Sequence, residues 1–81
     1  MELPLSALAR GEWAYISRVG GKADMALRLE ELGLMSGTRI ACELVSPAGD
    51  PAAYRVRGAL IALRRGDAEM VTVVPGEGEQ G

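Results

Sequence analysis

The sequence predicts a mainly β domain: a small barrel of five short strands, with one α-helix inserted after the first strand. Segments rich in β-forming residues recur at short intervals and are joined mostly by tight turns, a pattern typical of small barrels. Closing the sheet removes the exposed edges that a short open sheet would leave. Only one segment shows helical periodicity, and 81 residues suffice for a single domain.

The five strands are expected at residues 13–19, 38–46, 53–57, 60–64 and 70–74. Before them, residues 3–8 read as an opening turn that directs two leucines inward, and residues 65–68 as a further turn with one helical turn. Alternation along the second strand predicts that its inward-facing residues are Ile40, Cys42 and Leu44. In the third strand, Arg55 and Arg57 are expected on the outer face.

The helix is expected from Asp24 to Leu32, with Asp24 as its N-cap. Its apolar stripe is formed by Met25, Leu29 and Leu32. Gly33 fits the left-handed position just after the helix, and Leu34 then falls where a Schellman ending packs an apolar residue on Leu29. The sequence therefore predicts a sharp stop, followed by a turn through Met35 into the next strand.

Composition narrows the classes of partner. Nine basic and eleven acidic residues give a formal net charge of −2, which argues against nucleic acid as the main partner. Arginines cluster in the second half, and they form either a solvated strand face or a docking patch for an acidic protein: Arg55, Arg57, Arg64 and Arg65. A single cysteine and no signal-like or membrane-spanning segment favour the cytoplasm. We expect one domain over residues 1–75 and a disordered tail at 76–81.

The residues that most enzymes rely on are missing. There is no histidine, which removes Ser-His-Asp and Cys-His catalysis and the commonest transition-metal ligand. One cysteine cannot build a cysteine-rich zinc site, and no glycine-rich phosphate loop is present. We therefore predict a non-enzymatic binding module, with no catalytic and no metal-ligating residues assigned.

The chain resembles the ferrous iron transport protein A (FeoA) family over roughly residues 3–74. The resemblance starts with Leu5, Leu8, Gly11 and Ile16, and continues through the run at 29–40, which reads Leu-Glu-Glu-Leu-Gly-Leu-Met-Ser-Gly-Thr-Arg-Ile. It ends with the segments at 50–51, 54–58 and 61–64. It implies an SH3-like barrel and a cytoplasmic accessory protein of ferrous iron uptake. The implied partner is the cytosolic, GTPase-bearing part of a membrane iron transporter, and a weak association with ferrous iron is implied as well.

The leading hypothesis is thus a docking module, and its predicted partner-binding residues are Leu34, Met35, Arg55 and Arg57. For Leu34, a purely structural role in the helix cap is an equal alternative. Two regulatory readings stay open: a nucleic-acid-binding module, because small β-barrels often bind RNA or DNA, and a metal-responsive module. No nucleic acid is expected as the main partner, and the oligomeric state is left open.

Overall fold

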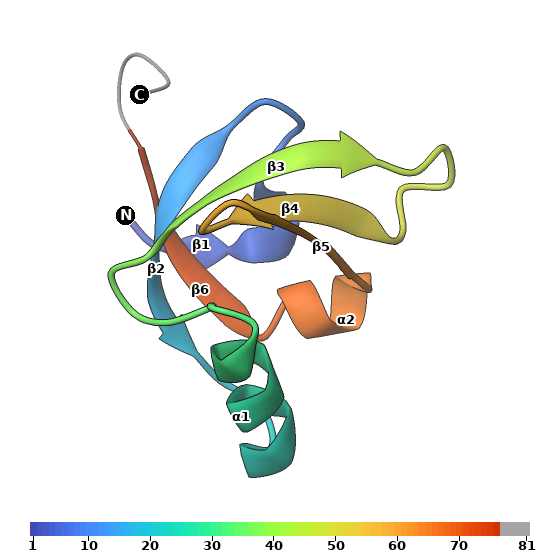
Figure 1. Cartoon of the computed structure of the whole chain (residues 1–81). Helices are drawn as coiled ribbons and strands as arrows, with labels where there is room; N and C mark the ends of the chain where they lie inside the picture. Colours follow the sequence, from blue (N-terminus) through green and yellow to red (C-terminus); the bar gives the residue numbers. More distant parts are fainter. Residues whose placement is uncertain (77–81) are drawn as a thin grey trace.

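The computed structural model describes residues 1–76. It consists of one antiparallel sheet of six strands that curls around a small core, with a helix at one end (Figure 1). In sheet order the strands are β1 (Leu3–Pro4), β6 (Val71–Pro75), β2 (Trp13–Val19), β3 (Arg39–Val45), β4 (Ala52–Val56) and β5 (Ala59–Leu63). The helices are a 3₁₀ turn (Leu5–Ala7), α1 (Ala23–Glu31) and α2 (Arg65–Ala68). The mainly β prediction is confirmed, with one strand more than expected.

The additional strand is β1, where an opening turn was predicted. Its two residues pair with β6, Leu3 opposite Val73 and Pro4 opposite Thr72. Just before it, the Glu2 carboxylate accepts hydrogen bonds from Ser17 Oγ at 2.8 Å and Arg18 Nη1 at 3.1 Å. These two bonds lower the pKa of Glu2. Two residues are too few to show an alternating pattern, so the sequence carries no readable signal for this strand.

The core lies on the concave side of the sheet and is aliphatic except for Tyr54 and Cys42. Its largest fully buried side chains are Leu5, Ile16, Leu29, Leu34, Ile40, Val56, Val71 and Val73. Ile40 and Cys42 face inward as predicted, but Leu44 is 50% exposed. The register between β3 and β4 shifts between Cys42 and Leu44, and an irregularity of this kind reverses the side on which later residues point. The prediction for Leu44 is therefore wrong.

Helix α1 ends as predicted but begins differently. Leu34 N donates to Leu29 O at 3.0 Å and Gly33 N donates to Glu30 O at 2.9 Å, the two bonds of a Schellman ending. The N-cap, however, is Lys22, without a side-chain cap. The carboxylate expected at the cap, that of Asp24, accepts from the neighbouring Met25 N instead.

The apolar stripe of α1 is narrower than predicted. Leu29 is fully buried, whereas Leu32 is 45% exposed, because the chain leaves the helix at that residue. Together, Leu29 and Leu34 fasten the helix to the sheet, and burying each leucine contributes roughly 1.5–3 kcal/mol.

The chain stays hydrogen-bonded just past β6, and the expected domain boundary at residue 75 stays a prediction. Gly76 N donates to Trp13 O at 2.9 Å, so Gly76 continues the ordered structure beyond β6. The rest of the expected disordered tail, residues 77–81, lies outside the described residues. Among residues 1–76, no helix combines the length and apolarity that crossing a membrane requires.

Candidate functional site

A groove rich in arginine runs over the outer face of β3. We call it the arginine groove; it is lined by Gly11, Thr38, Arg39, Ala41, Cys42, Glu43, Arg55 and Arg57. Strand alternation turns Arg39, Ala41 and Glu43 away from the core, and the register places Arg55 beside Ala41. Three guanidinium groups and one carboxylate therefore share one surface, which makes it locally basic on a chain whose net charge is −2.

The arginines on the strands have defined neighbours. Arg55 Nη2 lies 3.2 Å from Glu43 Oε1, and both side chains are close to half exposed, so this ion pair contributes little to stability. The guanidinium of Arg39 lies 4.1 Å from the ring centroid of Trp13, a cation–π contact. Trp13 packs edge-on against Tyr15, with ring centroids 5.2 Å apart. Two of the three aromatic side chains thus lie on the outer face beside the groove, not in the core.

Arg57 enters the groove from the turn between β4 and β5, not from a strand. Its φ is +51° and that of Gly58 is +83°, as the two central residues of a type I′ hairpin require. The stem of Arg57 runs next to the end of α1: a Cβ placed on Gly33 would lie 3.2 Å from Arg57 Cδ. The helix end and the β4–β5 turn are therefore packed together at this corner of the groove.

The predicted binding residues fall in three different places. Arg55 and Arg57 line the same groove and are both exposed. Met35, 40% exposed, lies instead beside a separate hollow between α1 and β2. Leu34 is 1% exposed and completes the helix cap, so its assignment to a contact surface is corrected.

Sequence reasoning missed four residues of this surface: Trp13, Tyr15, Arg39 and Glu43. A signal for the aromatic pair was present, because Trp13 and Tyr15 alternate with Ala14 and Ile16, which are both buried. Following that alternation would have placed both rings on the outer face.

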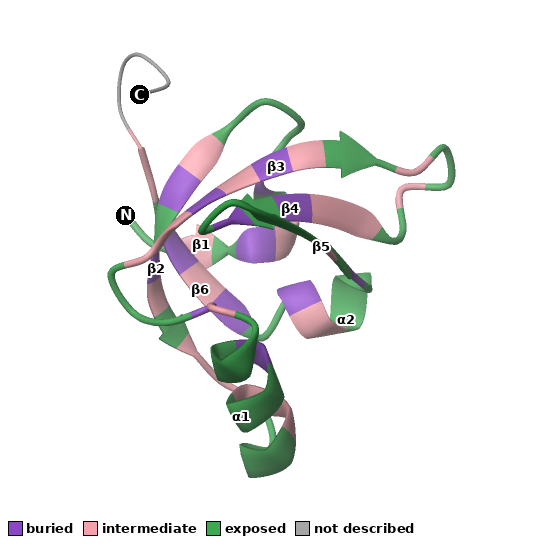
Figure 2. Ribbon diagram, in the orientation of Figure 1, coloured by how far each residue is buried: buried purple, intermediate pink, exposed green. Residues whose placement is uncertain are grey.

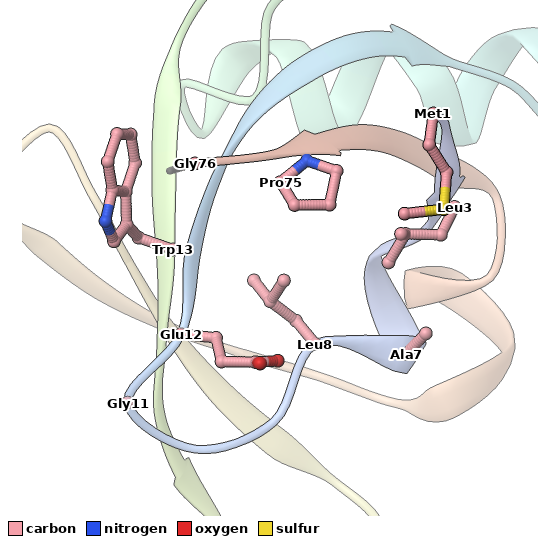
Figure 3. Close-up of a pocket in the computed structure, with 9 residues that line it drawn as sticks. All are labelled: Met1, Leu3, Ala7, Leu8, Gly11, Glu12, Trp13, Pro75 and Gly76. Atoms are coloured by element: carbon pink, nitrogen blue, oxygen red, sulfur yellow. The ribbon is translucent and has the colours of Figure 1, made fainter. Parts of the chain in front are cut away.

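A second hollow, mostly apolar, lies where the two ends of the described chain meet (Figure 3). Met1, Leu3, Leu8 and Pro75 surround it, and the Trp13 ring lies apart from them at its rim (Figure 3). Its one carboxylate, that of Glu12, accepts a hydrogen bond from Ala9 N at 2.7 Å and so braces the loop before β2. None of the predicted binding residues lines this hollow.

Residues 1–76 bring no three His, Cys, Asp or Glu side chains together as a metal site. The lone Cys42 is buried, and burial raises the pKa of its thiol, which disfavours the reactive thiolate.

The model of the FeoA domain family matches residues 3–75. The chain belongs to the FeoA domain family. A curated relative, the Fe(2+) transport protein A/Fe(2+) transporter FeoB fusion protein of Porphyromonas gingivalis, is 36% identical over 69 residues. That match covers 85% of this FeoA domain, which spans only 8% of the relative's length.

Solved FeoA structures share the fold. The FeoA protein of Chlorobium tepidum superposes with a TM-score of 0.88 at 33% identity, covering 98% of this chain and 75% of that one. The FeoA of Stenotrophomonas maltophilia, solved in complex with zinc and described as an SH3 domain protein, superposes with a TM-score of 0.80. It is 30% identical, and the match covers 89% of each chain. The expected SH3-like, mainly β architecture is thus confirmed.

Proposed function

We propose that this FeoA domain is a non-catalytic, cytoplasmic accessory protein of ferrous iron uptake. It binds the cytosolic, GTPase-bearing part of a membrane ferrous iron transporter through the arginine groove. The observation that carries the proposal is the P. gingivalis relative, which joins an iron transport protein A and a FeoB transporter in one chain. Fusion holds two modules at high effective concentration, an arrangement that suits modules which bind each other.

The arginine groove supplies the chemistry for such binding. Arg57 is exposed and forms no ion pair with any residue between 1 and 76, and Arg55 is only weakly engaged by Glu43. Arginine is favoured at protein interfaces because its planar guanidinium binds carboxylates through two parallel hydrogen bonds. The partner surface is accordingly acidic, and its attraction weakens as salt screens the charges.

The direct test is binding of variants to the immobilised cytosolic domain of the transporter. Arg57→Glu is expected to raise the Kd at least about tenfold, equivalent to about 1.4 kcal/mol, and Arg55→Glu to act in the same direction. Arg28→Glu is the matched control, since it reverses an exposed arginine on α1, outside the groove. If the two groove variants fold and bind as tightly as the control, the groove is not the docking surface.

Met35 tests how far the surface extends. Met35→Asp adds a charge to the hollow between α1 and β2, which shares no lining residue with the arginine groove. We expect weaker binding if the transporter covers this turn as well. Unchanged binding limits the contact to the arginine groove.

A nucleic-acid-binding function is the second candidate, because Trp13, Tyr15 and Arg39 together resemble a stacking platform. Trp13 is the only tryptophan, so its fluorescence reports directly on this surface. Quenching by an oligonucleotide that disappears with added salt supports this candidate, and an unchanged signal at low salt excludes it.

Metal response is a third reading, and the weak association of ferrous iron with the domain stays a prediction. In our proposal ferrous iron is the transporter's cargo, so the domain needs no tight site of its own. Titrating ferrous iron while recording amide NMR spectra checks this. Saturable changes at equimolar metal would favour a metal-responsive module instead.

A further inference from the structure

Strand β5 forms one edge of the sheet and has none of the features that normally protect an edge. Its sequence, Ala-Leu-Ile-Ala-Leu, is entirely apolar and carries no charge, proline or bulge. Three of its five residues are exposed, and Figure 2 shows β5 mostly in the colour of exposed residues. Natural proteins usually shield such an edge with charges, prolines or a covering segment, so an unprotected one suggests that something pairs with it.

The backbone groups available for pairing can be identified. The two-residue turn makes Val56 and Ala59 the closing pair of the β4–β5 hairpin, so alternate residues of β5 from Ala59 onward bond to β4. The N–H and C=O groups of Leu60 and Ala62 then point away from the sheet. Within residues 1–76, no hydrogen bond of a turn, loop or cap reaches either residue.

The side chains on the same face favour an apolar guest. Ala62 lies opposite Ala53, which lies opposite Leu44, so an apolar row crosses three strands and ends at the free edge. Leu44 and Leu60 are each about half exposed. A strand added beside β5 would continue this row with its own alternate side chains.

The charges that flank β5 indicate which kind of segment could pair with it. Exposed arginines flank β5: Arg57 lies two positions before its first residue, and Arg64 directly follows its last. Neither forms an ion pair with another residue of the described chain. A second copy of this chain fits poorly in the antiparallel register that pairs all five residues of the two β5 strands. In an antiparallel pair centred on Ile61, Arg57 of one copy would face Arg65 of the other, and like charges directly opposite destabilise a sheet. Acidic residues at these positions would be attracted instead.

We propose that β5 is a strand-addition site for an extended segment of a partner protein, with alternate apolar residues between two acidic ends. The guest spans about seven residues, five that pair with β5 and one acidic residue at each end. This inference does not depend on the transporter being the partner, because Leu60, Ala62 and Arg64 lie outside the arginine groove, and Arg57 alone belongs to both surfaces.

The test uses the whole domain and a blocked peptide, Glu-Val-Thr-Val-Thr-Val-Glu, with a lysine-ended version as the matched control. Amide hydrogen exchange by NMR is the readout. Saturating acidic peptide should slow exchange at Leu60 and Ala62 at least about tenfold, through their new hydrogen bonds. Ala59 and Ile61, already bonded to β4, should change little, so protection with a period of two is the signature of strand addition.

Variants separate the backbone from the charge. Ala62→Pro removes an outward N–H without breaking the ladder to β4 and should abolish protection at Leu60, whereas Ala62→Thr should retain it. Arg64→Glu should weaken binding of the acidic peptide about three- to tenfold, as reversal of a rim charge does. If Ala62→Pro fails to fold, the exchange pattern of the unmodified domain still decides.

Three results would overturn the proposal. The first is unchanged exchange at Leu60 and Ala62 with millimolar acidic peptide. The second is equal protection by the lysine-ended peptide, which would remove the role of charge. The third is slow exchange at Leu60 and Ala62 without peptide in a domain that sediments as a dimer, which would show that β5 pairs with a second copy of the chain. Loss of transporter binding in Arg55→Glu, with peptide protection at Leu60 and Ala62 retained in the same variant, would separate the two surfaces, because Arg55 lines the arginine groove and is not part of the β5 site.

Discussion

Gly33 offers the sharpest test of how α1 is joined to the rest of the domain. Its φ of +105° lies in a region that residues with a side chain rarely adopt, so Gly33→Val forces a β-branched residue into a strained conformation. The cost is on the order of 1–3 kcal/mol. A Cβ at this position would also lie 3.2 Å from Arg57 Cδ, which a flexible arginine can relieve by moving slightly. Backbone strain is therefore the larger contribution.

Thermal and urea unfolding followed by circular dichroism measure this cost. Each kcal/mol corresponds to about 4–8 °C in Tm for a domain of this size, so a cost near the middle of the range lowers Tm by roughly 8–16 °C. Gly66→Ala is the matched control, because Gly66 lies in α2, has no positive φ, and a Cβ there meets nothing within 4 Å. This control should stabilise the domain by about 0.4–1 kcal/mol. A loss near zero for Gly33→Val, or equal losses for both variants, would refute the assigned helix ending.

Three further predictions concern the core, the pH response and the chain end. Leu34→Ala should destabilise the domain by about 2–5 kcal/mol in urea unfolding, as truncation of a buried leucine does; a change below 1 kcal/mol would be inconsistent with its burial. Burial raises the pKa of Tyr54 above its usual value of about 10, so the phenol stays neutral in the fold while the unfolded chain ionises first. The neutral phenol therefore contributes fully to the free energy of unfolding below about pH 10, and this contribution is lost as the pH rises further. Unfolding curves at alkaline pH should show the decline, and Tyr54→Phe should reduce it. Gly76→Ala places a Cβ against the indole of Trp13 and should shift its fluorescence maximum; an unshifted spectrum would show that the chain end does not pack on that ring.

The fold was largely predictable because its helix ending and its turns are determined by residues close together in the sequence. Gly33 with Leu34 identifies the helix ending, and Gly58 indicates a tight turn between two strands, since each signal depends on residues adjacent in the chain. The sequence assigned Arg57 to the strand, whereas the structure places it in the turn. The prediction that Leu44 faces the core failed because its orientation depends on pairing with a strand that is distant in the sequence. The irregularity near Glu43 that exposes Leu44 arises from pairing with β4, and no pattern within β3 alone reveals it.

The candidate site was predictable only in part, for a similar reason. Arg55 and Arg57 were identified from alternation within one strand, but Arg39 reaches the same groove from another strand through the β3–β4 register. For Leu34 the sequence offered two roles, a contact residue and part of the helix cap, and its burial with the Schellman hydrogen bond supports the cap.

The backbone conformation of Arg57 sets the stability of the hairpin against binding of the proposed partner. The first central position of a type I′ turn suits asparagine or glycine, whereas a long side chain with φ of +51° costs about 1–2 kcal/mol. Redesign guided by stability alone would therefore replace this arginine and gain a firmer hairpin, while removing the cation that the proposed partner contacts. A more heat-resistant variant of this domain could thus be a poorer binder, a trade-off located in one two-residue turn.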